Sequence, residues 1–191
     1  MTPPDSPTPD MILPQPPNGT RYGMVNRRLG VLFVGRVNAG RSMMAEALLR
    51  HHAGHQFDAH SAGLTPVDRQ NPYALARLRA EGIATSGLAP KPLERFMAAD
   101  APPVDIVITV SELAATGMAG AWPGQPVTAH WALPDPDPAL YPDAPDDPEV
   151  LVDAIFQDLR RRIDVLSLLP AHCLLALSHW EDEDDDGLRT A

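Results

Sequence analysis

The strongest constraint on the fold is an apolar run that leads directly into a polar loop. Residues 29–34 read LGVLFV, which is typical of a strand buried on both faces of a parallel sheet. The next eight residues, 35–42, read GRVNAGRS, and we expect a helix to begin within them and to cover residues 41–52. A buried strand joined to a helix by a short loop indicates an α/β fold.

The rest of the chain continues this alternation. The expected strands are residues 57–62, 105–110 and 127–131, and the expected helices begin at Asn71–Pro72 and at Asp147–Pro148. The last helix carries apolar residues at a spacing of 3.6, namely Val152, Ile155, Phe156, Leu159, Ile163 and Leu166. Strands that alternate with helices predict a doubly wound parallel sheet. Ligands bind such sheets beyond the carboxyl ends of the strands, and the first such end is Val34–Gly35.

The two ends of the chain differ from its middle in composition. Residues 1–28 are rich in proline, and we expect a disordered leader there. Residues 29–170 are expected to form the folded domain, and residues 171–191 a C-terminal extension with an acidic tail. The tail, EDEDDD at residues 181–186, carries −6 of the net charge of −10. Such a run is expected to be solvated, and the alternative is a docking tail for a basic partner.

Charge and hydropathy exclude several classes of function. Lys and Arg total 15 against 25 Asp and Glu, which argues against nucleic-acid and anionic-membrane binding. No apolar run approaches the ~18 residues of a membrane span. The proline-rich start also lacks the apolar segment of a secretory signal. We therefore expect a cytoplasmic protein.

Metal and thiol chemistry find little support in the sequence. Cys173 is the single cysteine, which excludes an intrachain disulfide and a multi-thiolate metal site. His51, His52 and His55 stand close together, but no carboxylate or cysteine completes a ligand set beside them. We expect no metal and no cofactor.

The loop after the first strand has the composition of an oxyanion site. Backbone N–H groups at a helix N-terminus attract anions, and the helix dipole adds to this. Arg41 offers a planar fork of donors, Asn38 tolerates left-handed dihedrals, and Gly40 allows close backbone approach. The alternative is an ordinary turn with a surface arginine. The candidate oxyanion-binding residues are Arg36, Val37, Asn38, Ala39, Gly40, Arg41 and Ser42.

The stretch FVGRVNAGRSMMAEALLR resembles the phosphate-binding loop of the low-molecular-weight protein tyrosine phosphatase family, in its arsenate-reductase branch, where the loop reads C-x-x-N-x-x-R-S. The resemblance continues, in the same order, through residues 60–64, 71–74, 81–83, 86–87, 91–93, 107–110 and 130–136. It implies a flavodoxin-like three-layer α/β sandwich with a four-stranded parallel sheet.

The resemblance also implies roles for individual residues. Arg41 would bind the oxyanion, Ser42 would support the nucleophile, and Asn38 would shape the loop. Asp135, in an Asp-Pro pair, would be the general acid. Taken by itself, Asp135 lies in an Asp/Pro cluster of the kind that forms turns.

The chain departs from the family pattern where thiols are needed. Gly35 stands at the position of the nucleophilic cysteine, and the protonated guanidinium of Arg36 cannot replace a thiolate. The further thiols of arsenate reductases are also missing, because Ser111 and Met118 occupy the corresponding region. Cys173 lies in the extension, where we expect it to be buried and inert.

The leading interpretation is a catalytically inactive family member that binds phosphate, arsenate or sulfate, with a phosphorylated protein as a further candidate partner. One alternative is an active phosphatase or arsenate reductase with a non-covalent mechanism, in which Asp135 activates water. Another is an interaction module that uses the acidic tail.

Overall fold

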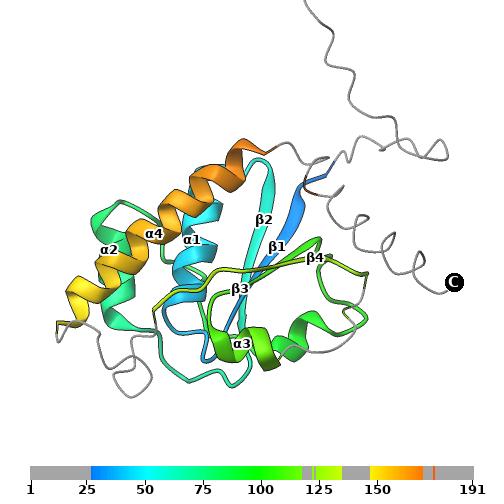
Figure 1. Ribbon diagram of the computed structural model, residues 1–191, viewed down its shortest axis with the longest axis horizontal. Helices are drawn as coiled ribbons and strands as arrows, with labels where there is room; N and C mark the ends of the chain where they lie inside the picture. Colours follow the sequence, from blue (N-terminus) through cyan, green and yellow to red (C-terminus); the bar gives the residue numbers. More distant parts are fainter. Residues whose placement is uncertain (1–26, 118–121, 123, 135–146, 170–173, 175–191) are drawn as a thin grey trace, which may run out of the picture.

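The sheet of the molecule has four strands, and all of them are parallel. The computed structural model describes residues 27–117, 122, 124–134, 147–169 and 174. The strands are β1 (Leu29–Gly35), β2 (Phe57–Gly63), β3 (Ile106–Thr109) and β4 (Val127–His130), in the order β2-β1-β3-β4. This confirms the expected flavodoxin-like α/β fold (Figure 1).

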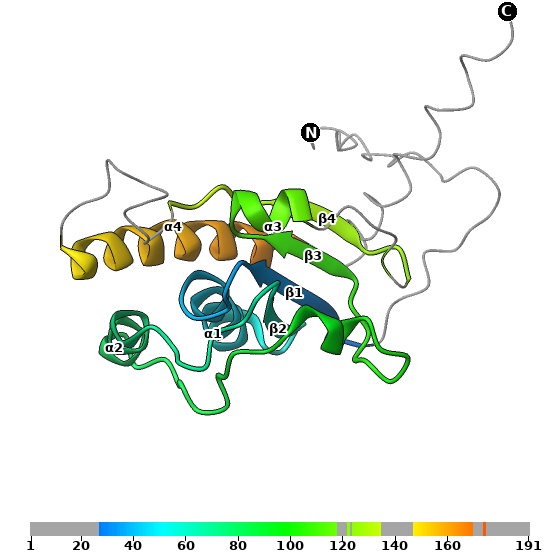
Figure 2. The same cartoon turned by 90° about the horizontal axis from the view of Figure 1, so that it is seen from below.

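The helices cover the sheet in two unequal groups. The larger core brings together α1 (Arg41–Ala53), α2 (Pro72–Ala80) and α4 (Pro148–Leu168). The smaller core lies on the other face, with the 3₁₀-helix η2 (Leu93–Phe96) and α3 (Glu112–Gly117). In the turned view of Figure 2, α3 lies apart from α1 and α2.

Strand β1 explains why the fold has two cores. All seven of its residues are buried. Leu29, Val31 and Phe33 belong to the larger core, whereas Leu32 and Val34 belong to the smaller one. Side chains alternate between the faces of a strand, so a continuous apolar run supplies both cores at once.

Local signals fix the starts of two helices as the sequence indicates. Asn71 caps α2, because its Oδ1 accepts from the N–H groups of Tyr73 and Ala74 at 2.9 and 3.1 Å. Asp147 caps α4 by accepting from the N–H of Glu149 at 2.8 Å. The apolar residues expected on the inner face of α4 are all buried: Val152, Ile155, Phe156, Leu159, Ile163 and Leu166.

Two short elements differ from expectation. Strand β3 covers Ile106–Thr109 and is shorter than the expected residues 105–110, although the backbone of Asp105 still donates to Gly30 and accepts from Val127, at 2.8 and 2.9 Å. Helix α3 directly follows β3 and was not expected from the sequence.

The described part of the chain continues beyond α4 to Leu174, which is 5% exposed and belongs to the larger core. Met118, Asp135 and Cys173 lie outside the described residues, as do residues 1–26. Within the described residues, no helix is both long enough and apolar enough to cross a membrane.

Candidate functional site

The candidate site is the loop between β1 and α1. Gly35 ends β1, residues 36–40 form the loop, and Arg41 and Ser42 open α1. The N-cap of α1 is Gly40, and no side chain caps the helix. The first N–H groups of a helix have no partner within it, so they are available to an anion.

The loop is supported along its length by residues 64–71. The N–H groups of Leu64, Thr65, Val67 and Asn71 donate to the carbonyl oxygens of Gly35, Arg36, Val37 and Ala39, at 3.2, 2.9, 3.2 and 2.8 Å respectively. In a trans peptide, a carbonyl and the next N–H point in opposite directions. The N–H groups of Val37, Asn38 and Gly40 therefore point away from the supporting segment, and none of the three donates to an acceptor within the described residues. N–H groups on one side of a loop at a helix N-terminus are the arrangement that anion-binding nests use.

Asn38 is the centre of the loop's side-chain hydrogen bonds. Its φ is 49°, the left-handed conformation that the sequence leads us to expect. Its Nδ2 donates to the hydroxyl oxygens of Ser42 and Ser61, both at 2.9 Å, and its Oδ1 accepts from the N–H of Lys91 at 2.8 Å. Asn38 is 1% exposed, and these three bonds use both the Nδ2 group and the oxygen of its buried amide.

A buried carboxylate continues this network beneath the loop. Glu46, on α1, is 2% exposed and accepts from the hydroxyl of Ser61. Lys91 Nζ lies 3.0 Å from Glu46 Oε2, and Arg50 binds the other carboxylate oxygen. Two cations therefore compensate for one buried anion.

Sequence reasoning missed Glu46, Ser61 and Lys91 as parts of the site. One signal for Glu46 is available, because it stands among the apolar residues Met43, Met44, Ala45, Ala47 and Leu48. A charged residue in an apolar stretch of a helix is rarely buried unless it is paired.

Gly35 faces Ser42. A Cβ placed on Gly35 lies 3.2 Å from Ser42 Oγ and 3.6 Å from Val110 Cγ2. The closer contact is tight, so a Cβ at Gly35 requires the Ser42 side chain to shift by a few tenths of an ångström. The backbone at Gly35 also lies outside the left-handed region, so its conformation does not require glycine.

Arg41 is largely buried, at 9% exposure. Its Nη1 donates to the carbonyl oxygens of Leu133 and Pro134, both at 3.1 Å. Arg41 therefore joins the loop to the segment that immediately precedes Asp135, the expected general acid.

A second polar cluster lies at the ends of β3 and β4. The hydroxyl of Thr109 is 2.7 Å from His130 Nδ1, and His130 Nε2 is 3.0 Å from a carboxylate oxygen of Glu112. Next to it, the hydroxyl of Ser111 accepts from the N–H of Ala114 at 3.2 Å, so Ser111 supports the start of α3. Sequence reasoning did not anticipate this cluster.

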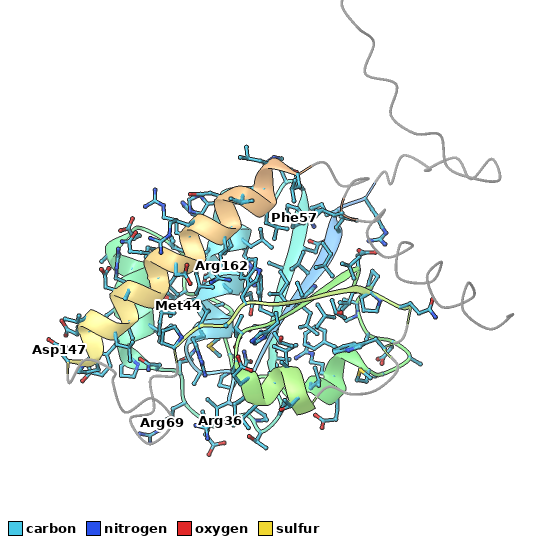
Figure 3. All side chains as sticks on the ribbon, viewed as in Figure 1. Arg36, Met44, Phe57, Arg69, Asp147 and Arg162 are labelled. Atoms are coloured by element: carbon cyan, nitrogen blue, oxygen red, sulfur yellow. The ribbon has the colours of Figure 1, made fainter. Side chains whose placement is uncertain are left out.

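The loop and its supporting segment each carry an arginine. Figure 3 shows Arg36 and Arg69 at the same edge of the molecule, on the loop and on its supporting segment.

Burial lowers the pKa of His60 below its usual value, although Glu46 and Asp58 oppose the shift. The exposed His51, His52 and His55 join no cluster of three potential metal ligands within the described residues.

Comparison with known families and structures adds to this geometry. The family model described as low molecular weight phosphotyrosine protein phosphatase matches residues 30–164. A search among curated proteins finds no match.

Among solved structures, the chain resembles arsenate reductases. It is 27% identical to a thioredoxin-dependent arsenate reductase of Corynebacterium glutamicum, with a TM-score of 0.55, over 75% of this chain and 64% of that one. It is 26% identical to an arsenate reductase in the phosphate binding state, with a TM-score of 0.55, over 73% of this chain and 96% of the other.

A tyrosine phosphatase from Escherichia coli, in complex with sulphate, shares the fold. The TM-score is 0.59 and the identity 16%, over 74% of this chain and 97% of that one.

Proposed function

This chain belongs to the low molecular weight phosphotyrosine protein phosphatase family, and we propose that it binds a phosphate or arsenate oxyanion at residues 35–42 without covalent catalysis. A phosphorylated protein is a candidate source of the phosphate, and a cytoplasmic location is part of the proposal.

The orientation of the loop backbone carries the proposal for binding. Because N–H groups of residues 64–71 donate to the loop carbonyl oxygens, the N–H groups of Val37, Asn38 and Gly40 point toward the opposite side. The start of α1, which no side chain caps, lies beside them. These groups favour a tetrahedral anion, because they offer several donors and a positive helix end. A structural relative in the phosphate binding state is consistent with this.

The absence of a side chain at Gly35 carries the proposal for inactivity. By resemblance, a thiolate from this position attacks phosphorus or arsenic, and glycine offers no atom for that step. The nearest hydroxyl, that of Ser42, accepts from Asn38 Nδ2 and serves the loop. Loss of the nucleophile from a coupled catalytic unit lowers turnover on the order of a millionfold.

Arsenate reduction meets a second obstacle. It requires further thiols to release arsenite, and this chain has one cysteine, Cys173, outside the described residues. Ser111 stands where one such thiol is expected, and its hydroxyl is used to support α3. A single thiol cannot run an internal disulfide relay.

The proposal is tested by calorimetric titration with phosphate, arsenate and sulfate, together with an aryl-phosphate hydrolysis assay. We expect saturable binding that weakens with salt, because the attraction is electrostatic. Binding should be lost in Arg41→Ala and retained in Arg69→Ala, an exposed arginine at the same edge.

Arg41→Lys serves as a second variant, because it keeps the charge and loses the planar fork. Thermal unfolding of each variant shows whether it is folded. Equal phosphate affinity in the wild type and a folded Arg41→Ala contradicts the binding site. Steady turnover above ~1 s⁻¹, an ordinary enzyme rate, contradicts inactivity and supports a non-covalent mechanism.

A further inference from the structure

An apolar groove lies between Trp131, which follows β4, and the second half of α4. Its volume is about 400 Å³, and it is lined by Trp131, Arg161, Arg162, Val165, Leu166 and Leu169. Val165 is 61% exposed and Leu169 is 40% exposed. Apolar side chains gathered in an exposed groove favour an occupant that removes them from water.

The rim of the groove is basic. Arg161 and Arg162 both pair with Asp158, at 3.4 and 3.0 Å, so one carboxylate serves two guanidinium groups. Arg162 also stands over the ring of Trp131, with its guanidinium carbon 5.8 Å from the ring centroid. Figure 3 places Arg162 in the second half of α4. The groove therefore fits an apolar side chain that is followed by acidic residues.

The chain itself carries such a segment. Trp180 is followed directly by the six acidic residues 181–186. Residues 175–191 lie outside the described part of the chain, and they begin beside Leu174. Leu174 is buried in the same core cluster as Leu166, which lines the groove.

The segment is longer than the groove. The six residue steps from Leu174 to Trp180 span up to about 20 Å when extended. The eight helical residues from Arg161 to Leu168 cover about 12 Å. A chain that turned back at Leu174 would therefore be long enough to run along the groove and to bring residues 181–186 beside the two arginines.

We propose that residues 175–191 fold back onto α4 of the same chain, with Trp180 in the groove and residues 181–186 beside Arg161 and Arg162. The basic partner of the acidic tail is then part of the same molecule. Burial of the Trp180 ring stabilises the docked tail through its apolar area. The opposite charges select which end of the tail faces which end of the groove.

Indole N–H signals in NMR spectra of the ¹⁵N-labelled full chain test this proposal. The three tryptophans, Trp122, Trp131 and Trp180, are assigned by single replacement with phenylalanine. Removal of residues 179–191 should shift the Trp131 signal and leave the Trp122 signal in place, because Trp122 packs in the smaller core. A cooperative thermal unfolding transition confirms that the shortened chain is folded.

A synthetic peptide of residues 175–191, added to the shortened chain, should restore the Trp131 signal of the full chain. Trp180→Ala in the peptide should weaken its binding at least about tenfold, because a large aromatic side chain is no longer buried. A peptide with the six acids replaced by their amides should bind more weakly, and high salt should remove that difference.

Charge reversal in the full chain supplies the matched control. Arg161→Glu with Arg162→Glu should give the Trp131 signal of the shortened chain, and lysines at residues 181–186 should return it toward the docked position. Identical Trp131 signals in the full and shortened chains overturn the proposal. So does a Trp131 shift in the full chain that grows with protein concentration, because it indicates the tail of a second copy.

Discussion

The two halves of the sheet's carboxyl edge are built differently. At the end of β1 and β2, the side chains of Asn38, Ser42 and Ser61 are buried and bonded to one another. At the end of β3 and β4, the Thr109–His130 pair reaches outward to Glu112, whose side chain is 78% exposed. The hydrogen bonds of the first half are buried, whereas those of the second half extend to an exposed carboxylate.

In the proposed function, binding and chemistry depend on different atoms of this edge. Binding rests on the loop N–H groups and on the buried side chains that support them, and both are in the first half. By resemblance, attack needs a thiol at Gly35, in the same half, whereas arsenite release needs a further thiol at Ser111, in the second half. Both thiols are missing while the buried support of the loop remains, so the proposed binding does not depend on them.

The largest expected effect comes from placing a thiol in the first half of the edge, at Gly35. Gly35→Cys should raise aryl-phosphate hydrolysis by orders of magnitude over the wild type, because it returns the nucleophile beside Ser42 and the uncapped start of α1. The new thiol's pKa should fall below ~8.5 by one unit or more, because the helix N-terminus and Arg41 favour the thiolate. Turnover and iodoacetamide reactivity against pH measure both.

Gly35→Ser is the matched control, because it adds a similar side chain without a thiolate and should remain inactive. Arsenite release should be absent in Gly35→Cys and should require a second change such as Ser111→Cys. A folded Gly35→Cys with neither hydrolysis nor a lowered thiol pKa indicates that the loop does not support a thiolate.

Removal of the buried Glu46 charge should destabilise the first half of the sheet's carboxyl edge. Glu46→Gln leaves Lys91 and Arg50 without their carboxylate, so we expect a loss of about 3 kcal/mol in the free energy of unfolding. Phosphate affinity should also fall, because Ser61 and Asn38 lose their support. Urea unfolding and calorimetry measure the two effects. Glu94→Gln, at an exposed position, should change the free energy of unfolding by less than about 0.5 kcal/mol.

The corresponding change in the second half should be milder. Thr109→Val removes the hydroxyl that contacts His130, and we expect it to lower the free energy of unfolding by about 1 kcal/mol. Phosphate affinity should stay at the wild-type value. Thr128→Val, at an exposed neighbour on β4, controls for the substitution itself. A loss of phosphate binding in Thr109→Val alone would show that the two halves are coupled.

The smallest effect concerns pH. The pKa of His60 is lowered in the folded protein, chiefly by burial. Below about pH 6.5, the unfolded chain therefore binds more protons at this site than the folded one. The contribution of His60 to stability is present above that pH and is lost as the pH falls through the lowered pKa. Urea unfolding at several pH values should show a flatter profile for His60→Gln than for the exposed control His55→Gln.

Local patterns in the sequence predicted much of the fold. The run at residues 29–34 predicted a strand buried on both faces, and the Asn-Pro and Asp-Pro pairs predicted two helix starts. These features depend on neighbours in the chain, so a single sequence contains them. Helix α3, with six residues, is too short for a periodic pattern to identify.

The site was predictable only in part. The left-handed conformation of Asn38 follows from residue type and loop position. Its contacts with Ser61 and Lys91 join residues 23 and 53 positions away, and no local pattern records them. Such pairs form because the parallel strands bring distant segments to one edge, which is decided by the fold as a whole. The role implied for Asp135 stays a prediction.

The support that residues 64–71 give to the loop has a consequence for kinetics. If the loop binds an anion as proposed, its carbonyls are already held, so no folding step is needed when the anion arrives. Association rates of related ligands at one site differ little. We therefore expect phosphate and arsenate to differ in affinity mainly through their dissociation rates.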